Sequence, residues 1–311
     1  MKNDNILQWL LDGDIAIQYQ VHRDLLGKIR PDLQQRIKSE GWGQAFLSKR
    51  LENGHWGYKF YQPKWTSTHY TLLDLKNLAI EPAVPEIQET IRLVLNEEKG
   101  RDGGVRPIGT TQSSDVCING MFLNYAAYFQ TPENDLASIV DFLLSQYMAD
   151  GGFNCFSNRK GCVHSSLHTT LSVLEGILEY ARNGYTYRLD ELQRTAATAR
   201  EFILMHRLFK SDKTGAVIDP RMTMLSFPCR WRYDILRALD YFQSAETPFD
   251  DRMADALELI LKKRNPEGKW PLQNNHPGVV HFDMERVGKP SRWNTLRAIR
   301  VFRFFRIPEQ G

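Results

Sequence analysis

The sequence predicts an all-α protein with the (α/α)6 toroid fold, in which six helical hairpins form a closed barrel. A glycine-centred cluster recurs along the 311 residues at intervals of roughly 50 to 65 residues, the range in which repeat architectures are found. An amphipathic segment precedes each cluster, and an irregular strap leads from the cluster to a second helix. No segment shows the sustained period-two pattern of a β-strand. The clusters occupy 53–56, 102–105, 150–153, 214–217 and 267–270.

The first helix of each hairpin is predicted from apolar residues that recur at three- and four-residue spacing, which is the helical period. In the segment before the third cluster, Phe142, Leu143, Gln146 and Tyr147 lead directly into the Gly-Gly turn. A short helix near the start of the chain supplies the sixth copy. The predicted first helices are 6–11, 33–51, 84–97, 136–148, 189–209 and 253–263.

The second helices can be aligned with one another. The segment 293–299 (Trp-Asn-Thr-Leu-Arg-Ala-Ile) matches 233–239 (Tyr-Asp-Ile-Leu-Arg-Ala-Leu), and the segment 19–25 supplies the sixth copy. The other second helices begin near 66, 114 and 165, and the copy that starts at 117 fits least well. Each copy has one residue at an equivalent position near its start, and these six residues are Tyr19, His69, Cys117, His168, Tyr233 and Trp293.

Closure of the array into a ring predicts a single domain over 1–311. A linear solenoid is the alternative, but it needs polar caps at its ends, whereas the last helix ends in the apolar segment 301–305. In a closed ring the helix near Ile6 meets the C-terminal helix. Residues at equivalent positions of the second helices then face one central cavity.

The composition is typical of a globular protein, with 42% hydrophobic and 25% charged residues. The net charge of +3 comes from mixed acids and bases, so no nucleic-acid partner is expected. No run of about 18 apolar residues predicts a membrane span. The first residues form an amphipathic segment rather than an apolar signal core, and the four cysteines lack CxxC spacing. Free thiols and a cytoplasmic location are therefore expected.

The Gly-Gly-aromatic turns and the helical hairpins resemble the toroid shared by protein prenyltransferase β subunits and the squalene/oxidosqualene class of terpenoid cyclases. The pattern of Phe142, Leu143 and Gln146 followed by Gly151-Gly152-Phe153 is similar to the repeat signature of the cyclases. The resemblance covers about 6–305. It implies a small-molecule or isoprenoid-like ligand in the central cavity.

The segment Asp115-Val116-Cys117 resembles the Asp-x-Cys that supplies two zinc ligands in prenyltransferase β subunits. The third ligand there is a His near the start of the next inner helix, which corresponds to His168, and His164 is a rival or additional ligand. Zinc with one open position removes the proton from a bound thiol. The resemblance therefore implies a zinc-dependent transferase that activates a thiol substrate.

Each of these residues also has an ordinary structural interpretation. Asp115 can serve as an N-cap, Cys117 as a small buried residue, and His168 as a core imidazole. The sequence also departs from the prenyltransferases, because 108–114 contains no base to hold a diphosphate and Ile118 replaces a Tyr. A helical α-subunit-like partner is neither shown nor excluded by one chain.

Two other functions remain open at this point. One is a non-catalytic toroid that binds an apolar ligand or a partner segment. The other is a diverged terpenoid cyclase relative, because the D-x-D-D motif that supplies the cyclase acid is missing from the sequence.

Arginines one turn after the equivalent position suggest an anion site. Arg23, Arg237 and Arg297 occupy that place in three copies, with Arg230 and Arg232 nearby. Helix N-termini that gather at the same end of a toroid also favour an anion. The alternative is that the arginines pair with neighbouring acids such as Asp24 and Asp240. The predicted cavity residues are His69, His164, Tyr233, Trp293, Tyr19, Arg237 and Arg297, whereas His55, His206, His276 and His281 are interpreted as surface or capping groups.

Overall fold

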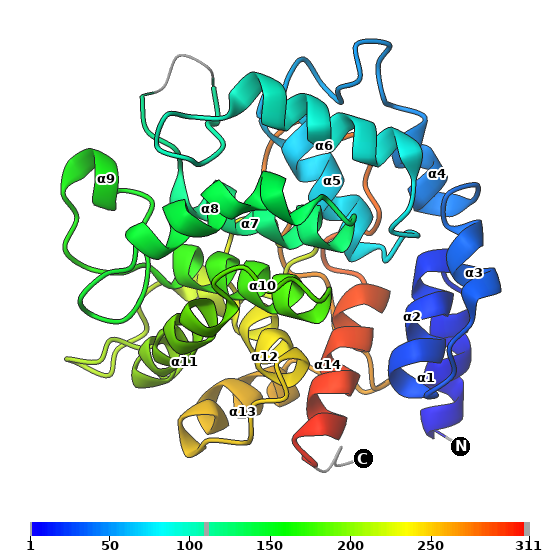
Figure 1. Ribbon diagram of the computed structural model, residues 1–311. Helices are drawn as coiled ribbons and strands as arrows, with labels where there is room; N and C mark the ends of the chain where they lie inside the picture. Colours follow the sequence, from blue (N-terminus) through cyan, green and yellow to red (C-terminus); the bar gives the residue numbers. More distant parts are fainter. Residues whose placement is uncertain (1, 109–111, 308–311) are drawn as a thin grey trace. The chain divides into compact units, whose positions relative to one another are not determined.

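The computed structural model describes residues 2–108 and 112–307, and within these ranges all regular secondary structure is helical (Figure 1). Isolated β-bridges, such as that between Lys99 and Val105, close turns without forming a strand among the described residues. The prediction of an all-α protein is therefore confirmed. The chain divides into two compact units: the first comprises Met1–Ser48, Asn77–Glu81 and Met205–Gly311, and the second comprises Lys49–Lys76 and Pro82–Leu204.

The first unit combines the two ends of the chain. Helix α14 packs against both α12 and α2, so the last hairpin of the chain contacts the first (Figure 1). The helices of this unit are α1 (Lys2–Leu11), α2 (Ile15–Leu25), α3 (Pro31–Arg36), α4 (Gly41–Leu47), α12 (Ile235–Ser244), α13 (Ala254–Lys262) and α14 (Arg292–Phe304), with 3-10 turns at Pro220–Thr223 and Asp251–Met253.

The second unit contains the middle of the chain. Its helices are α5 (Thr68–Asn77), α6 (Pro85–Glu98), α7 (Val116–Tyr128), α8 (Glu133–Ser145), α9 (Ser157–Lys160), α10 (Leu167–Arg182) and α11 (Leu189–Met205), with a 3-10 turn at Lys64–Thr66. In chain order the helices follow the predicted succession of first and second helices. The short α9 is an addition within a strap, and its position was not predicted.

The predicted helix 33–51 is divided into α3 and α4, which corrects its predicted extent. Gly41 at the division has a φ of 58°, in the left-handed region that favours glycine. A Cβ there would lie 2.1 Å from Oδ2 of Asp14, because the Asp14 carboxylate occupies that space. Asp14 accepts hydrogen bonds from the backbone N–H groups of Ala16, at 2.9 Å, and of Trp42, at 2.8 Å. One carboxylate therefore satisfies donors in the first turns of both α2 and α4.

The glycine-centred turns are joined to the second helices by one recurring hydrogen bond. In four of the five clusters, the last residue of the cluster donates its backbone N–H to a side-chain oxygen near the start of the next helix. The second glycine is also required, because a Cβ on Gly104 or Gly152 would lie 2.7 Å from the Cβ of Ser114 or Ser165, respectively. The four pairs are Trp56 with Thr68 (3.0 Å), Val105 with Asn119 (2.7 Å), Phe153 with Thr170 (3.0 Å) and Trp270 with Thr295 (3.0 Å).

These bonds test the alignment of the second helices. Asn119, Thr170 and Thr295 occupy the same aligned position, two residues after Cys117, His168 and Trp293, so the alignment of these three copies is correct. The alignment of the copy at His69 was wrong by three residues, because Thr68 makes the equivalent bond where the alignment predicts Thr71. The strap before α5 is short, and η1 brings Thr68 up to Trp56 one turn early.

Helices α7 and α10 lie side by side and make the most extensive helix–helix contact among the described residues of the second unit (Figure 1). Gly120 and Gly176 lie where the two helices cross. A Cβ on Gly176 would lie 2.4 Å from the carbonyl oxygen of Gly120, and a Cβ on Gly120 would lie 2.8 Å from the backbone of Ser172. Glycine is therefore required on both sides, because any side chain would push the backbones apart.

Candidate functional site

A group of buried basic side chains lies in the first unit, where the strap 224–234 enters α12. Arg230 and Arg237 are each 6% exposed, and His276 is 7% exposed. We call Arg230, Arg232, Arg237 and His276 the cationic cluster. Arg232 is half-buried and the other three are buried. Basic side chains are seldom buried to this degree, so the gathering of three buried groups within one short region requires a physical explanation.

Local hydrogen bonds fix the backbone that carries these arginines. Asp234 caps α12 by accepting from the backbone N–H of Arg237 at 2.9 Å, and it also accepts from the Ser226 hydroxyl at 2.9 Å. Nη1 of Arg237 donates to the carbonyl of Arg232 at 2.9 Å. The Arg232 guanidinium lies 4.7 Å from the Trp231 ring centroid, and Arg230 has a φ of 55°, which is uncommon for a residue with a side chain. The arginines are therefore held in place before any ligand binds.

His276 reaches the cluster from a second strap. The backbone N–H of Gln273 donates to the carbonyl of Leu225 at 2.9 Å, and the Gln273 side chain accepts from the Leu225 N–H at 3.1 Å. These bonds bring His276 beside Cys229, whose backbone hydrogen-bonds the imidazole. Burial, followed by the positive charges of Arg232, Arg230 and Arg237, lowers the pKa of His276 to about 4. The imidazole is therefore neutral at pH 7 and lies in a positive electrostatic field.

Tyr233 adds a phenol to the same region. The side chain is 2% exposed, and burial raises the pKa of Tyr233 well above its ordinary value. The charge of Asp234 raises this pKa further, whereas that of Arg237 lowers it. The phenol of Tyr233 is therefore protonated at pH 7. The charge of Arg237 acts on both this neutral hydroxyl and the neutral imidazole of His276.

Two of the predicted anion-binding arginines are paired with carboxylates instead. Nε of Arg297 lies 3.2 Å from Asp240, which also accepts two bonds from Arg300, each 2.5 Å long. Arg23 lies 2.5 Å from Asp24. This is the alternative interpretation given above for Arg23 and Arg297. Only Arg237 of the three belongs to the cationic cluster.

Trp293 and Tyr19 pack within the first unit. Trp293 is 2% exposed, and its ring stacks on Phe227 at a centroid distance of 4.4 Å and lies 6.0 Å from the ring of Trp42. Tyr19 is buried, and the guanidinium carbon of Arg23 lies 5.5 Å from the centroid of the Tyr19 ring. Trp293 thus serves as an aromatic packing group within the first unit.

His69 is a fully buried core residue of the second unit. Its Nδ1 lies 3.2 Å from the Tyr125 hydroxyl, and the rings of Phe60, Tyr61 and Tyr70 surround it. Burial lowers the pKa of His69 to about 3. His69 is therefore held as a neutral imidazole among aromatic rings.

The three predicted zinc ligands lie on two neighbouring helices. Asp115 is the N-cap residue of α7, Cys117 is in the first turn of α7, and the half-buried His168 is in the first turn of α10; His164 is exposed on the strap before it. The described part of the chain contains no group of three or more His, Cys, Asp and Glu side chains that could hold a metal ion. The residues as placed do not form the predicted ligand set, and zinc binding stays a prediction.

Cys117 instead lies beside a second thiol. Its backbone N–H donates to Sγ of Cys155 at 3.1 Å, and the Thr169 hydroxyl donates to the same sulfur at 3.4 Å. A hydrogen bond from the Cys117 thiol lowers the pKa of Cys155, and the same bond raises the pKa of Cys117. We call Cys117 and Cys155 the thiol pair. Cys155 is 38 residues from Cys117 in sequence, and its spacing gave no signal of this contact.

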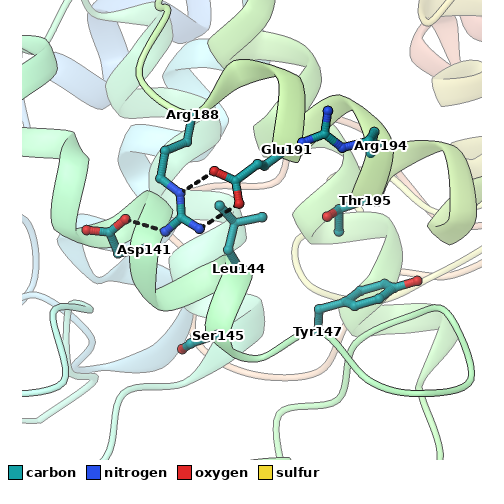
Figure 2. A pocket seen from close by; sticks show the side chains of 8 residues that line it. All are labelled: Asp141, Leu144, Ser145, Tyr147, Arg188, Glu191, Arg194 and Thr195. Atoms are coloured by element: carbon teal, nitrogen blue, oxygen red, sulfur yellow. Dashed lines mark hydrogen bonds and ion pairs between the residues drawn. The ribbon is translucent and has the colours of Figure 1, made fainter.

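A surface hollow of about 360 Å³ lies between α8 and α11 of the second unit (Figure 2). Its most prominent group is Arg188, which lies 2.7 Å from Asp141 and 2.7 Å from Glu191. Two carboxylates therefore already bind this guanidinium.

The interpretation of His276 as a surface or capping group is wrong, because His276 is buried. Arg230 and Arg232, in contrast, lie near Arg237 as the sequence predicts. The sequence signal for His276 is weak, since it is a single His in a polar strap.

Among the described residues, no helix combines the length and the apolar character needed to cross a membrane.

No protein-family model and no curated protein sequence matches this chain. Among solved structures, the chain is similar to a polysaccharide lyase, with a TM-score of 0.51 and 12% identity over 96% of this chain and 90% of the lyase. It is also matched to the type II terpene cyclase MstE from Scytonema in complex with its substrate geranylgeranyl dihydroxybenzoate, with a TM-score of 0.45 and 13% identity over 94% of this chain and 88% of that one. A second MstE structure, in complex with the product merosterolic acid A, has a TM-score of 0.33 and 14% identity over 84% of this chain and 94% of that one.

The likeness to the polysaccharide lyase shows the fold, which is an all-α toroid of helical hairpins, as the sequence predicts. At 12% identity it shows nothing about activity.

Proposed function

We propose that this protein binds an anionic organic molecule at the cationic cluster, with a carboxylate or phosphate group held by Arg230, Arg232 and Arg237. The observation that carries the proposal is the gathering of Arg230, Arg232 and Arg237 around the buried His276, with Arg230 and Arg237 each only 6% exposed. Burial, and after it the charges of these three guanidinium groups, lowers the pKa of His276, which is consistent with a positive field at this place. The same field attracts an anion, and low local polarity strengthens the attraction.

The chemistry of the cluster suits an anion better than a neutral ligand. A guanidinium presents a planar fork of N–H donors that matches the paired oxygens of a carboxylate or phosphate. Asp234 fixes the backbone at Arg237, and the bond from Nη1 of Arg237 to the Arg232 carbonyl orients the Arg237 guanidinium, so this side chain loses less conformational entropy on binding. The site is therefore organised for an anion in advance.

His276 and Tyr233 give the site a capacity beyond binding. A neutral imidazole can accept a proton, and a protonated phenol can donate one. Both groups lie in the field of Arg237, which would stabilise negative charge that develops on a bound molecule. General acid–base chemistry on an anionic substrate is the reaction class that these groups support best.

Calorimetric titration at low ionic strength tests the proposal with two probes, pyrophosphate and D-glucuronate. Because a hydrogen bond to a charged group contributes about 1.5–3 kcal/mol, Arg232→Ala should weaken binding about tenfold or more. Preference for one probe identifies the anion as a phosphate or as a carboxylate. Arg221→Ala is the matched control, since Arg221 is exposed and pairs with Asp219 on the surface.

The control should leave the affinity of the preferred probe unchanged. The proposal fails if neither probe binds to folded wild-type protein. It also fails if Arg232→Ala and Arg221→Ala weaken binding equally, because the effect would then reflect net charge and not the cluster.

A further inference from the structure

We infer that the thiol pair is a site of thiol–disulfide exchange, in which Cys155 attacks a small disulfide and Cys117 then completes an internal disulfide. The site belongs to the second unit and is independent of the cationic cluster. Cys117 and Cys155 are both free thiols, and each residue is half-buried.

The sulfurs of Cys162 and Cys229 also accept hydrogen bonds, from Asn154 at 3.2 Å and from Arg297 at 3.4 Å, respectively. The Cys155 sulfur differs in that donors from two helices meet at it. It accepts a hydrogen bond from the Cys117 N–H at 3.1 Å and one from the Thr169 hydroxyl at 3.4 Å, and the Cys117 thiol donates to it as well. Donors of this kind stabilise a thiolate, which is the attacking species in exchange. Cys155 is therefore assigned as the attacking residue.

The start of α7 contributes to the same effect. The Cys117 N–H belongs to the first turn of a 13-residue helix, where amide groups point outward and carry partial positive charge. A sulfur anion at Cys155 thus faces the N-terminal end of α7. Thr169 places a second donor at the start of α10, so two helices hold one sulfur atom.

The position of Cys117 makes it the resolving residue. Its backbone nitrogen lies 3.1 Å from Sγ of Cys155, and a nitrogen lies about 1.5 Å from its own Cα, so the Cys155 sulfur is within about 4.6 Å of the Cys117 Cα. The two side chains are in hydrogen-bond contact. A disulfide between them therefore requires only rotation of side chains and a small adjustment of the strap.

The reaction balances with oxidised glutathione as the oxidant. The Cys155 thiolate attacks one glutathione sulfur, which breaks the glutathione disulfide, forms a mixed disulfide and releases one glutathione thiolate. The Cys117 thiol then loses its proton and attacks the Cys155 sulfur, which releases the second glutathione. Two protein thiols are oxidised by two electrons, one glutathione disulfide is reduced, and the two protons end on the two glutathione thiols.

The new bond would join the strap that carries α9 to the first turn of α7. That strap runs from the end of α8 to the start of α10, and Asn158 on it already donates to the Ser114 carbonyl at 2.9 Å. Oxidation would therefore lock a contact that exists in the reduced protein. The consequence is a redox-dependent constraint on the strap of the third glycine cluster.

The experiment uses full-length protein in a buffer of oxidised and reduced glutathione, followed by acid quenching, alkylation of remaining thiols and peptide mass spectrometry. In wild-type protein we expect a peptide pair joined by Cys117 and Cys155. Cys117→Ser should stop at the mixed disulfide of Cys155 with glutathione. Cys155→Ser should abolish both products, while Cys162→Ser, the matched control from the same strap, should leave the Cys117–Cys155 disulfide unchanged.

Circular dichroism establishes that each variant is folded. The inference is overturned if folded wild-type protein keeps Cys155 reduced while Cys162 is modified, or if the disulfide that forms joins Cys155 to Cys162. Because these readouts come from wild-type protein as well as from the variants, a variant that fails to fold does not leave the question undecided.

Discussion

His69 and His276 are buried imidazoles with a lowered pKa, and burial is the largest cause at both, but only His276 also lies among positive charges. His69 is surrounded by aromatic rings, so burial alone lowers its pKa to about 3. The pKa of His276 is lowered to about 4 by burial, together with the charges of Arg232, Arg230 and Arg237. The first arrangement stabilises a core, whereas the second creates an electrostatic field that can act on a ligand. A lowered histidine pKa therefore indicates a ligand site only where nearby positive charge, and not burial alone, contributes to it.

The lowered pKa of His69 predicts a loss of stability in acid. The unfolded chain takes up a proton near pH 6.5 and the folded chain near pH 3, so the contribution of His69 is present above pH 6.5 and is lost as the pH falls toward 3. Between pH 6.5 and 5 this one residue should lower the free energy of unfolding by about 1.5 kcal/mol. Urea unfolding at several pH values measures it.

His69→Gln supplies the comparison, because glutamine keeps a polar group near Tyr125 but does not titrate. The pH dependence of this variant should be shallower than that of the wild type by the same amount. Equal slopes for the two proteins would show that His69 does not titrate as the structure indicates.

The two Gly-Gly turns depend on glycine for two separate reasons, conformation and space. Gly103 and Gly151 adopt φ values of 89° and 92°, which side chains disfavour. Gly104 and Gly152 are required because the start of the following strap or helix leaves no room for a Cβ. The recurring bond from the next backbone N–H to a Thr or Asn oxygen then sets the register of the second helix. These turns are therefore the repeated structural unit of the chain.

The crossing of α7 and α10 supports a prediction for a helix interface. Gly176→Ala should introduce about 1–3 kcal/mol of overpacking strain, because its Cβ would meet the Gly120 carbonyl oxygen at 2.4 Å and the helices must separate. Alanine gains roughly 1 kcal/mol over glycine in helix propensity, so the net destabilisation of the second unit should be up to about 2 kcal/mol. Thermal unfolding followed by circular dichroism measures the difference.

Thr198→Ala, at an exposed position of α11 in the same unit, is the control and should change the free energy of unfolding by less than about 0.5 kcal/mol. A Gly176→Ala protein at least as stable as the wild type would show that the two backbones are not held in contact.

At the scale of the whole molecule, the fold is an α/α toroid in which one hairpin plan is repeated with different side chains. The second unit contains the thiol pair and the three residues of the zinc hypothesis, and the first unit contains the cationic cluster. Equivalent repeat positions have thus acquired different roles. Trp293 packs against Phe227, whereas its counterpart Cys117 contacts another thiol.

The zinc hypothesis is tested on the intact protein. It predicts about one zinc ion per chain after purification without chelators, and loss of that zinc in Cys117→Ala and in His168→Ala, because a catalytic zinc site needs three protein ligands. Inductively coupled plasma mass spectrometry measures the metal content. Metal-free wild-type protein that is folded and remains metal-free after incubation with zinc contradicts the hypothesis.

The sequence by itself determined the helical class, the hairpin plan and the alignment of three second helices, because glycine turns and apolar spacing are local features. It misplaced the His69 copy by three residues, since the length of a strap does not reveal how it folds. It also left the arginines undecided. Which of them are paired depends on segments distant in sequence, as in Arg297 with Asp240.

Only the tertiary structure decided where charge and sulfur gather. His276 joins Arg230 and Arg232 because two straps lie side by side, and Cys155 joins Cys117 across 38 residues of chain. Local patterns specify helices and turns through nearby backbone and side-chain preferences. The neighbours of a buried charge or thiol are set by packing between distant segments, and those neighbours determine its chemistry.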